Sequence, residues 1–100
     1  MKTDIQFVQM PTSETMDSYM REKLSPLSKK YEWLTFAEVF FKKENDPKGK
    51  GKICEVQLSL PGPRIFASSN EKNFELAVKK TISDLEKQLK KRKYEMKPHM

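Results

Sequence analysis

Residues 74–93, FELAVKKTISDLEKQLKKRK, combine an apolar and a basic pattern in one stretch. The apolar side chains recur every three or four positions, at Phe74, Ala77, Val78, Ile82, Leu85 and Leu89. At about 100° of rotation per residue, this spacing places them on one face of an α-helix, with Lys80, Lys87 and Lys91 roughly opposite. The stretch therefore predicts an amphipathic helix that packs its apolar face on a core and presents positive charge to solvent.

The positive charge of the chain is concentrated around this helix. The chain has 100 residues and a net charge of +6, from 20 Lys plus Arg and 14 Asp plus Glu. Residues 71–100 hold nine of the basic and five of the acidic residues, so they supply +4 of the total. Charge gathered on one element is typical of a protein that binds nucleic acid or another polyanion. A solvated, lysine-rich helix face would have the same composition, so charge alone leaves both interpretations open.

The N-terminal third predicts a strand followed by a helix. Residues 2–10 mix apolar and polar side chains and predict a strand that ends in a turn. Residues 13–31 then have apolar side chains at helical spacing, with Ser13 placed as the N-cap. Pro26 falls inside this helix and has no amide hydrogen to donate, so we expect a kink or a restart near Ser25.

Three strand patterns follow, over residues 35–43, 52–60 and 64–69. The breaks between them, at 44–51 and 61–63, are rich in Gly, Pro, Asn and Asp, which favour turns. The basic helix is expected to begin near Asn70. The predicted order of elements is therefore β-α-β-β-β-α.

Strands joined by short turns form an antiparallel meander, and two amphipathic helices can bury their apolar faces only on one face of that sheet. We therefore predict an α+β fold, a two-layer sandwich with two helices packed on one face of a four-stranded sheet. Residues 1–95 would form a single domain and 96–100 a short flexible tail. In this arrangement the lysines of the first helix join the basic side of the last helix in a shared groove or ridge.

Residues for catalysis or metal binding are scarce. His99 is the only histidine and Cys54 the only cysteine, and together they cannot supply the three or four protein ligands of a zinc site. Cys54 alternates with apolar neighbours, so we expect a buried, unreactive thiol. Three glycines are too few for a phosphate-binding loop or a dinucleotide fingerprint. The sequence therefore predicts a protein that is not an enzyme and has no cofactor and no metal.

The sequence also bears on the cellular compartment. No run approaches the ~20 apolar residues of a membrane-spanning helix, and the start MKTDIQFVQM is too polar for a secretory signal. We expect a cytoplasmic protein with no membrane partner.

Aromatic residues near the second predicted strand are candidates for stacking on bases. Alternation places Phe36 and Phe40 on one face of this strand and Phe41 on the other. We expect most of these rings, with Trp33, to lie in the core, and at least one of them on the open side of the sheet.

The order of elements resembles the bacterial ribosome hibernation-promoting factor family, in its short form. The resemblance rests on three stretches, ASS at 67–69, NFELAV at 73–78 and DLEKQLKKRK at 84–93. Residues 87–91, KQLKK, are similar to the pattern that ends the second helix of the family. The first helix adds similar residues at 13–14, 23–24 and 29–31. The resemblance covers about residues 2–94.

This resemblance implies a partner and a mode of action. The protein would bind the small ribosomal subunit and its ribosomal RNA in the channel for mRNA and tRNA, and inhibit translation in stationary phase or stress. It would be a monomer off the ribosome, with no DNA and no small-molecule substrate as partners. The RNA-binding residues implied are Lys23, Lys29, Lys30, Lys79, Lys80, Lys87, Lys90, Lys91, Arg92 and Lys93. Arg92 is the one side chain among them that can bind a phosphate in a bidentate manner.

Two other functions stay open. A protein interaction module would use the open face of the sheet, with the basic helix as a solvated surface, and its binding would depend little on salt. A general double-stranded RNA-binding domain would bind any sufficiently long duplex, so free duplex would compete for it.

Overall fold

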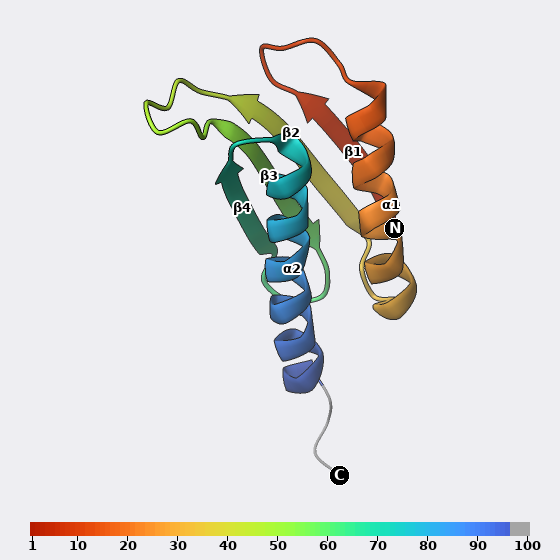
Figure 1. Ribbon diagram of the computed structural model, residues 1–100. Helices are drawn as coiled ribbons and strands as arrows, with labels where there is room; N and C mark the ends of the chain where they lie inside the picture. The colour runs from red at the N-terminus through yellow and green to blue at the C-terminus, as the bar shows by residue number, and fades with distance from the viewer. Residues whose placement is uncertain (97–100) are drawn as a thin grey trace.

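The computed structural model describes residues 1–96, which form an α+β fold with the predicted order of elements. The elements are β1 (Lys2–Phe7), α1 (Glu14–Lys30), β2 (Phe36–Lys43), β3 (Lys52–Ser59), β4 (Ile65–Glu71) and α2 (Phe74–Met96). The two helices lie side by side on one face of the four-stranded sheet (Figure 1). The predicted fold class is therefore confirmed.

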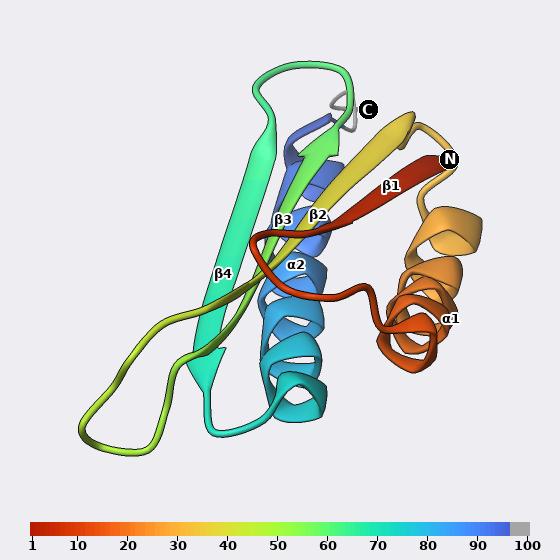
Figure 2. The same ribbon diagram turned by 90° about the horizontal axis from the view of Figure 1, so that it is seen from above.

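The sheet has the order β1-β2-β3-β4. β2, β3 and β4 pair antiparallel, as predicted for a meander, and β1 pairs parallel with β2 after the crossover through α1. Figure 2 shows β1 and β4 at the two edges of the sheet, and the loop between β2 and β3 extending beyond it. In Figure 1 this loop and the start of α2 lie at one end of the molecule, and the end of α2 lies at the other.

The core lies between the sheet and the helices. Alternate residues of the strands point into it, so Val39, Phe41, Cys54 and Val56 are fully buried. The helices contribute the apolar side chains that their spacing predicted, Leu24, Leu27, Val78, Leu85 and Leu89. Phe36 and Phe40 share one face of β2, as the alternation indicated, and this is the open face of the sheet. The expectation that most of the four rings near β2 lie in the core is therefore wrong, because only Phe41 among the four is fully buried.

The main differences from the predicted elements are at three boundaries. β1 ends at Phe7, because the chain turns at residues 8–10, where Gln9 has a φ of +54°. β4 continues to Glu71, since its last residues pair with the start of β3. α2 begins at Phe74 and not near Asn70, and the side chain of Asn73 accepts a hydrogen bond of 2.7 Å from the amide of Leu76. That cap decides where the helix starts.

α1 begins as predicted and passes through its proline. Ser13 is the N-cap, and its Oγ accepts a hydrogen bond of 3.2 Å from the amide of Met16. The expected restart at Ser25 is wrong, because α1 is one helix from Glu14 to Lys30. Pro26 lies on the exposed side, where water can satisfy the carbonyl group that lost its donor, while Leu24 on the other side is held in the core.

The end of the chain is described as far as Met96, which belongs to α2. The remaining residues of the predicted tail, 97–100, lie outside the described residues, and they include His99.

Candidate nucleic-acid interface

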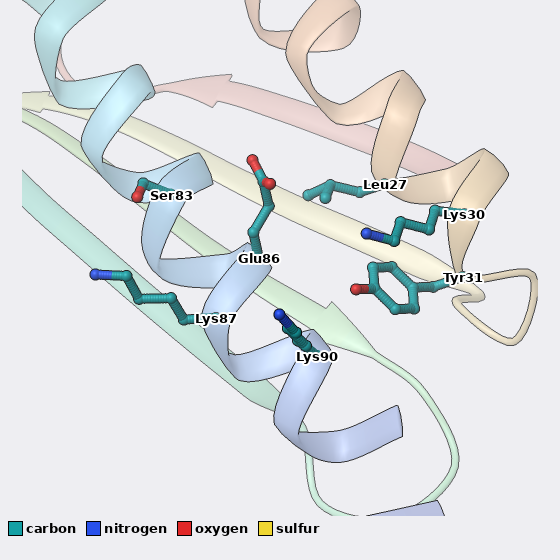
Figure 3. A pocket seen from close by; sticks show the side chains of 7 residues that line it. All are labelled: Leu27, Lys30, Tyr31, Ser83, Glu86, Lys87 and Lys90. Carbon is teal, nitrogen blue, oxygen red and sulfur yellow. The ribbon is translucent and has the colours of Figure 1, made fainter. Parts of the chain in front are cut away.

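A groove separates the ends of α1 and α2 on the helical face of the molecule. It has a volume of about 320 Å³ and is lined by Leu27, Lys30, Tyr31, Ser83, Glu86, Lys87 and Lys90 (Figure 3). Leu27 and Tyr31 are buried, at 4% and 2% exposure, and form its apolar floor. The lysines come from both helices, so the packing of α1 beside α2 brings together charges that are far apart in the sequence.

Two further hollows continue from this groove toward the end of α2. One, of about 230 Å³, is lined by Lys30, Tyr31, Lys90, Lys93 and Tyr94. The other, of about 530 Å³, is lined by Lys87, Lys90, Lys91, Tyr94 and Glu95. Lys90 lines all three hollows and so lies at their centre. We call this surface the basic groove, and its five lysines are Lys30, Lys87, Lys90, Lys91 and Lys93.

The ring of Tyr31 holds two of these lysines near each other. Tyr31 is the C-cap residue of α1, and the Nζ atoms of Lys30 and Lys93 lie 5.5 and 5.9 Å from its ring centroid. The negative face of an aromatic ring attracts ammonium groups, which offsets part of their mutual repulsion. Tyr31 thus positions one lysine from each helix at the same point of the groove.

The five groove lysines are available for an anion. Within the described part of the chain, ion pairs within 4.0 Å involve Arg21, Lys42, Lys50 and Lys80, and none involves a groove lysine. Glu86 lines the groove as well, and Figure 3 shows its carboxylate pointing toward α1. Five ammonium groups against this carboxylate and that of Glu95 leave the surface positive, and such a potential attracts phosphate.

Lys80 and Arg92, both predicted to bind RNA, make contacts within the protein. The Nζ of Lys80 lies 2.9 Å from Oε2 of Glu71, which is 8% exposed. The hydrogen bond from Lys80 lowers the pKa of Glu71 below its ordinary value, with nearby Lys50 adding to the effect. This contact attaches the end of β4 to α2.

Arg92 attaches a different segment to the same helix. Its Nη1 donates hydrogen bonds to the carbonyl oxygens of Pro61 and Pro63, at 3.3 and 2.8 Å. These carbonyls belong to the turn between β3 and β4, where Gly62 has a φ of +90°. Arg92 therefore fastens this turn to α2 on the side of the helix away from Lys90.

The other predicted residues lie outside the groove. Lys23 extends over the ring of Tyr19 on the same helix, with its Nζ 5.3 Å from the centroid. Lys29 and Lys79 are exposed and line none of the three hollows. The structure thus brings together five of the ten predicted residues.

Sequence reasoning missed the two tyrosines of this surface. Tyr31 is buried under two lysines, and Tyr94 is 81% exposed beside Lys90 and Lys91. The spacing of Tyr94, four residues after Lys90 and three after Lys91, places the ring on the same helix face as these lysines. That spacing is the signal from which Tyr94 could have been found.

Within residues 1–96, Cys54 and the acidic side chains do not form a further site. Burial raises the pKa of the Cys54 thiol to about 12, and Thr81 donates a hydrogen bond to the carbonyl oxygen of Cys54. In residues 1–96, no three His, Cys, Asp or Glu side chains lie close enough to hold a metal ion. As far as the helices are described, neither is long and apolar enough to cross a membrane.

A family model described as "Sigma 54 modulation protein / S30EA ribosomal protein" matches residues 3–97 of this chain. The chain belongs to this family. The match covers both helices and all four strands, and it confirms the resemblance to the hibernation-promoting factors. None of the curated protein sequences matches this chain at a significant level.

Solved structures share the fold. A ribosomal subunit interface protein from Coxiella burnetii has a TM-score of 0.81 at 22% sequence identity, over 94% of this chain and 99% of that one. The N-terminal domain of Protein Y from Thermus thermophilus has a TM-score of 0.77 at 20% identity, over 91% of this chain and 98% of that one. At these identities the comparison shows the fold.

Proposed function

We propose that this protein binds the small ribosomal subunit, in the channel that mRNA and tRNA occupy, and inhibits translation by blocking that channel. The observation that carries this proposal is the basic groove, in which Lys90 lies among four other lysines from two helices. Membership of the S30EA ribosomal protein family supports the ribosome as the partner. A protein of the same fold is described as a ribosomal subunit interface protein, which agrees with this partner.

In the proposed complex, lysine side chains of the protein contact phosphates of the RNA. Ribosomal RNA presents a dense array of them, and each lysine that neutralises a phosphate releases condensed counterions into solution. The packed helices set the relative positions of the backbone sites from which the five lysines extend, so no backbone rearrangement is needed on binding. A protein that inhibits translation by occupying the channel needs no catalytic group. A binding surface made of lysines, and a buried, protonated thiol at Cys54, agree with this. The proposed protein is a cytoplasmic monomer that acts in stationary phase or stress.

We rank the predicted contacts by where their residues lie in the fold. We propose the five groove lysines as the principal phosphate contacts and Lys23, Lys29 and Lys79 as outlying ones. Lys80 and Arg92 already bind Glu71 and the β3–β4 turn, so we assign them to the stability of the fold.

A protein interaction module that uses the open sheet face is the second candidate. Phe66 favours it, because this ring is 54% exposed on that face. Phe36 and Phe40 lie on the same face. However, the strand register pairs each of the three rings with a polar residue of β3, namely Gln57, Ser59 and Glu55. A docking face for another protein needs a broader apolar patch. The basic groove is therefore the better-supported binding surface.

Co-sedimentation with ribosomes in a sucrose gradient tests the proposal. The groove variant changes Lys87, Lys90 and Lys91 to Gln, and the wild-type protein is expected to travel with the small subunit while the variant stays at the top. The control variant changes the exposed Lys43, Lys48 and Lys72 to Gln. It loses the same charge at the other end of the molecule, so it is expected to bind like the wild type.

Three outcomes would contradict the proposal. Absence of the wild-type protein from the ribosomal fractions would exclude the ribosome as its partner. Equal loss of binding in both variants would show that net charge, and not the groove, is responsible. Displacement by excess free RNA duplex would favour a general double-stranded RNA-binding domain. Circular dichroism spectra of both variants are the control for folding.

A further inference from the structure

Tyr94 is a large ring that the protein leaves in solvent. It is 81% exposed, whereas Tyr31 is 2% exposed and Tyr19 is partly buried against the core. In the described structure the Tyr94 ring forms no aromatic pair, and its hydroxyl makes no hydrogen bond to another described residue. The packing of the fold therefore gives no reason for an aromatic side chain at this position.

The surroundings of Tyr94 are those of a binding surface. The ring lies between two hollows of the basic groove, since it lines both of them. Lys87 and Lys91 line the hollow on one side, Lys30 and Lys93 the hollow on the other, and Lys90 lines both. An exposed ring with ammonium groups on both sides offers a stacking face and neighbouring contacts for negative charge.

We propose that Tyr94 stacks on an unpaired base of the RNA that occupies the basic groove. This inference rests on the proposed function and specifies the RNA that the groove accepts. A base has a π-face whatever its identity, and an exposed aromatic ring can cover that face while the flanking phosphates contact lysines. In a duplex both faces of each base are covered by stacked neighbours. The groove would thus take a single strand, or a nucleotide turned out of a helix.

The test compares Tyr94→Leu with Tyr94→Phe, which removes the hydroxyl and keeps the ring. The ligands are a fluorescently labelled oligouridine, which stays unpaired, and an RNA duplex of the same length, with Kd measured by anisotropy at several salt concentrations. For oligouridine, Tyr94→Leu is expected to raise the Kd by about 5- to 150-fold, the equivalent of one stacked base. Tyr94→Phe is expected to bind like the wild type.

Two readouts separate stacking from a merely structural role. The slope of log Kd against log salt concentration should be the same for Tyr94→Leu and the wild type, because the substitution removes no charge. The Kd for the duplex should also stay the same, since Tyr94 has no free base face to cover there. An unchanged Kd for oligouridine in Tyr94→Leu, or a parallel loss for the duplex, would overturn the proposal.

Co-sedimentation of the same preparations with ribosomes distinguishes the two proposals. If the wild type travels with ribosomes but does not bind oligouridine even at low salt, the stacking proposal is wrong and the proposed function stands. If oligouridine binds through Tyr94 but no protein reaches the ribosomal fractions, the stacking proposal stands and the ribosome is not the partner.

Discussion

Replacing Lys87, Lys90 and Lys91 with Gln removes three of the five groove lysines and should change how ribosome binding depends on salt. Each lysine–phosphate contact contributes about −0.7 to −0.9 to the slope of log binding constant against log salt concentration. The five principal contacts alone thus predict a slope of about −3.5 to −4.5 for the wild type, and the two principal contacts that remain predict about −1.4 to −1.8 for the variant.

These slopes correspond to large differences in affinity. Between 50 and 200 mM salt, a fourfold change, the wild type should lose about 130- to 500-fold in affinity and the variant about 7- to 12-fold. The assay is the binding of labelled protein to purified small subunits at four or more salt concentrations. The Lys43, Lys48 and Lys72→Gln control should keep the wild-type slope, because these residues lie outside the groove.

A wild-type slope that is shallower than about −2 would refute the reasoning, because fewer than three phosphates would then be neutralised. Equal slopes for the groove variant and the wild type would refute it as well. In that case the contacts with the ribosome would lie on another surface, such as the open face of the sheet.

Three further predictions concern residues that act within the fold. Arg92→Ala should lower the free energy of unfolding by about 1–2 kcal/mol in urea, because two hydrogen bonds to the β3–β4 turn are lost, and it should leave the salt slope of ribosome binding unchanged. A reduced slope with unchanged stability would instead show that Arg92 contacts phosphate. Glu71→Gln should reduce the loss of folding stability at acid pH. The pKa of Glu71 in the folded protein is below its ordinary 4.5, so the ionised carboxylate stabilises the protein above that pH. This stabilisation is lost as the pH falls through the folded pKa. Urea midpoints between about pH 6 and pH 3 measure this, and parallel curves for variant and wild type would contradict it. Cys54 should react with a thiol reagent near pH 8 only after unfolding, because burial raises its pKa to about 12; rapid labelling of the native protein would show an exposed thiolate.

Local patterns in the sequence predicted much of the fold. Helical spacing identified the buried faces of both helices, and alternation identified Cys54 as a core residue and placed Phe41 on the face opposite Phe36 and Phe40. Ser13 was recognisable as a cap because its role depends only on the three residues that follow it. Features that repeat within a few residues are visible in sequence, since their geometry comes from the backbone of one element.

Two of the features that were missed depend on partners elsewhere in the chain, whereas the start of α2 depends on the local cap Asn73. β4 extends to Glu71 because β3 pairs with its last residues, and α1 continues through Pro26 because Leu24 and Leu27 are held in the core. Pairing and packing of this kind outweigh the local preferences of one residue.

The sequence by itself determined the kind of surface this protein has: a basic, amphipathic helix at the end of an α+β domain. Only the tertiary structure decided which basic residues lie together. Lys30 lies beside Lys90 and Lys93 because α1 packs beside α2, whereas Arg92 and Lys80, on the same helix, contact the β3–β4 turn and Glu71. The physical reason is that charge and periodicity belong to single elements, while the distance between two charges on different helices is decided by how those helices pack.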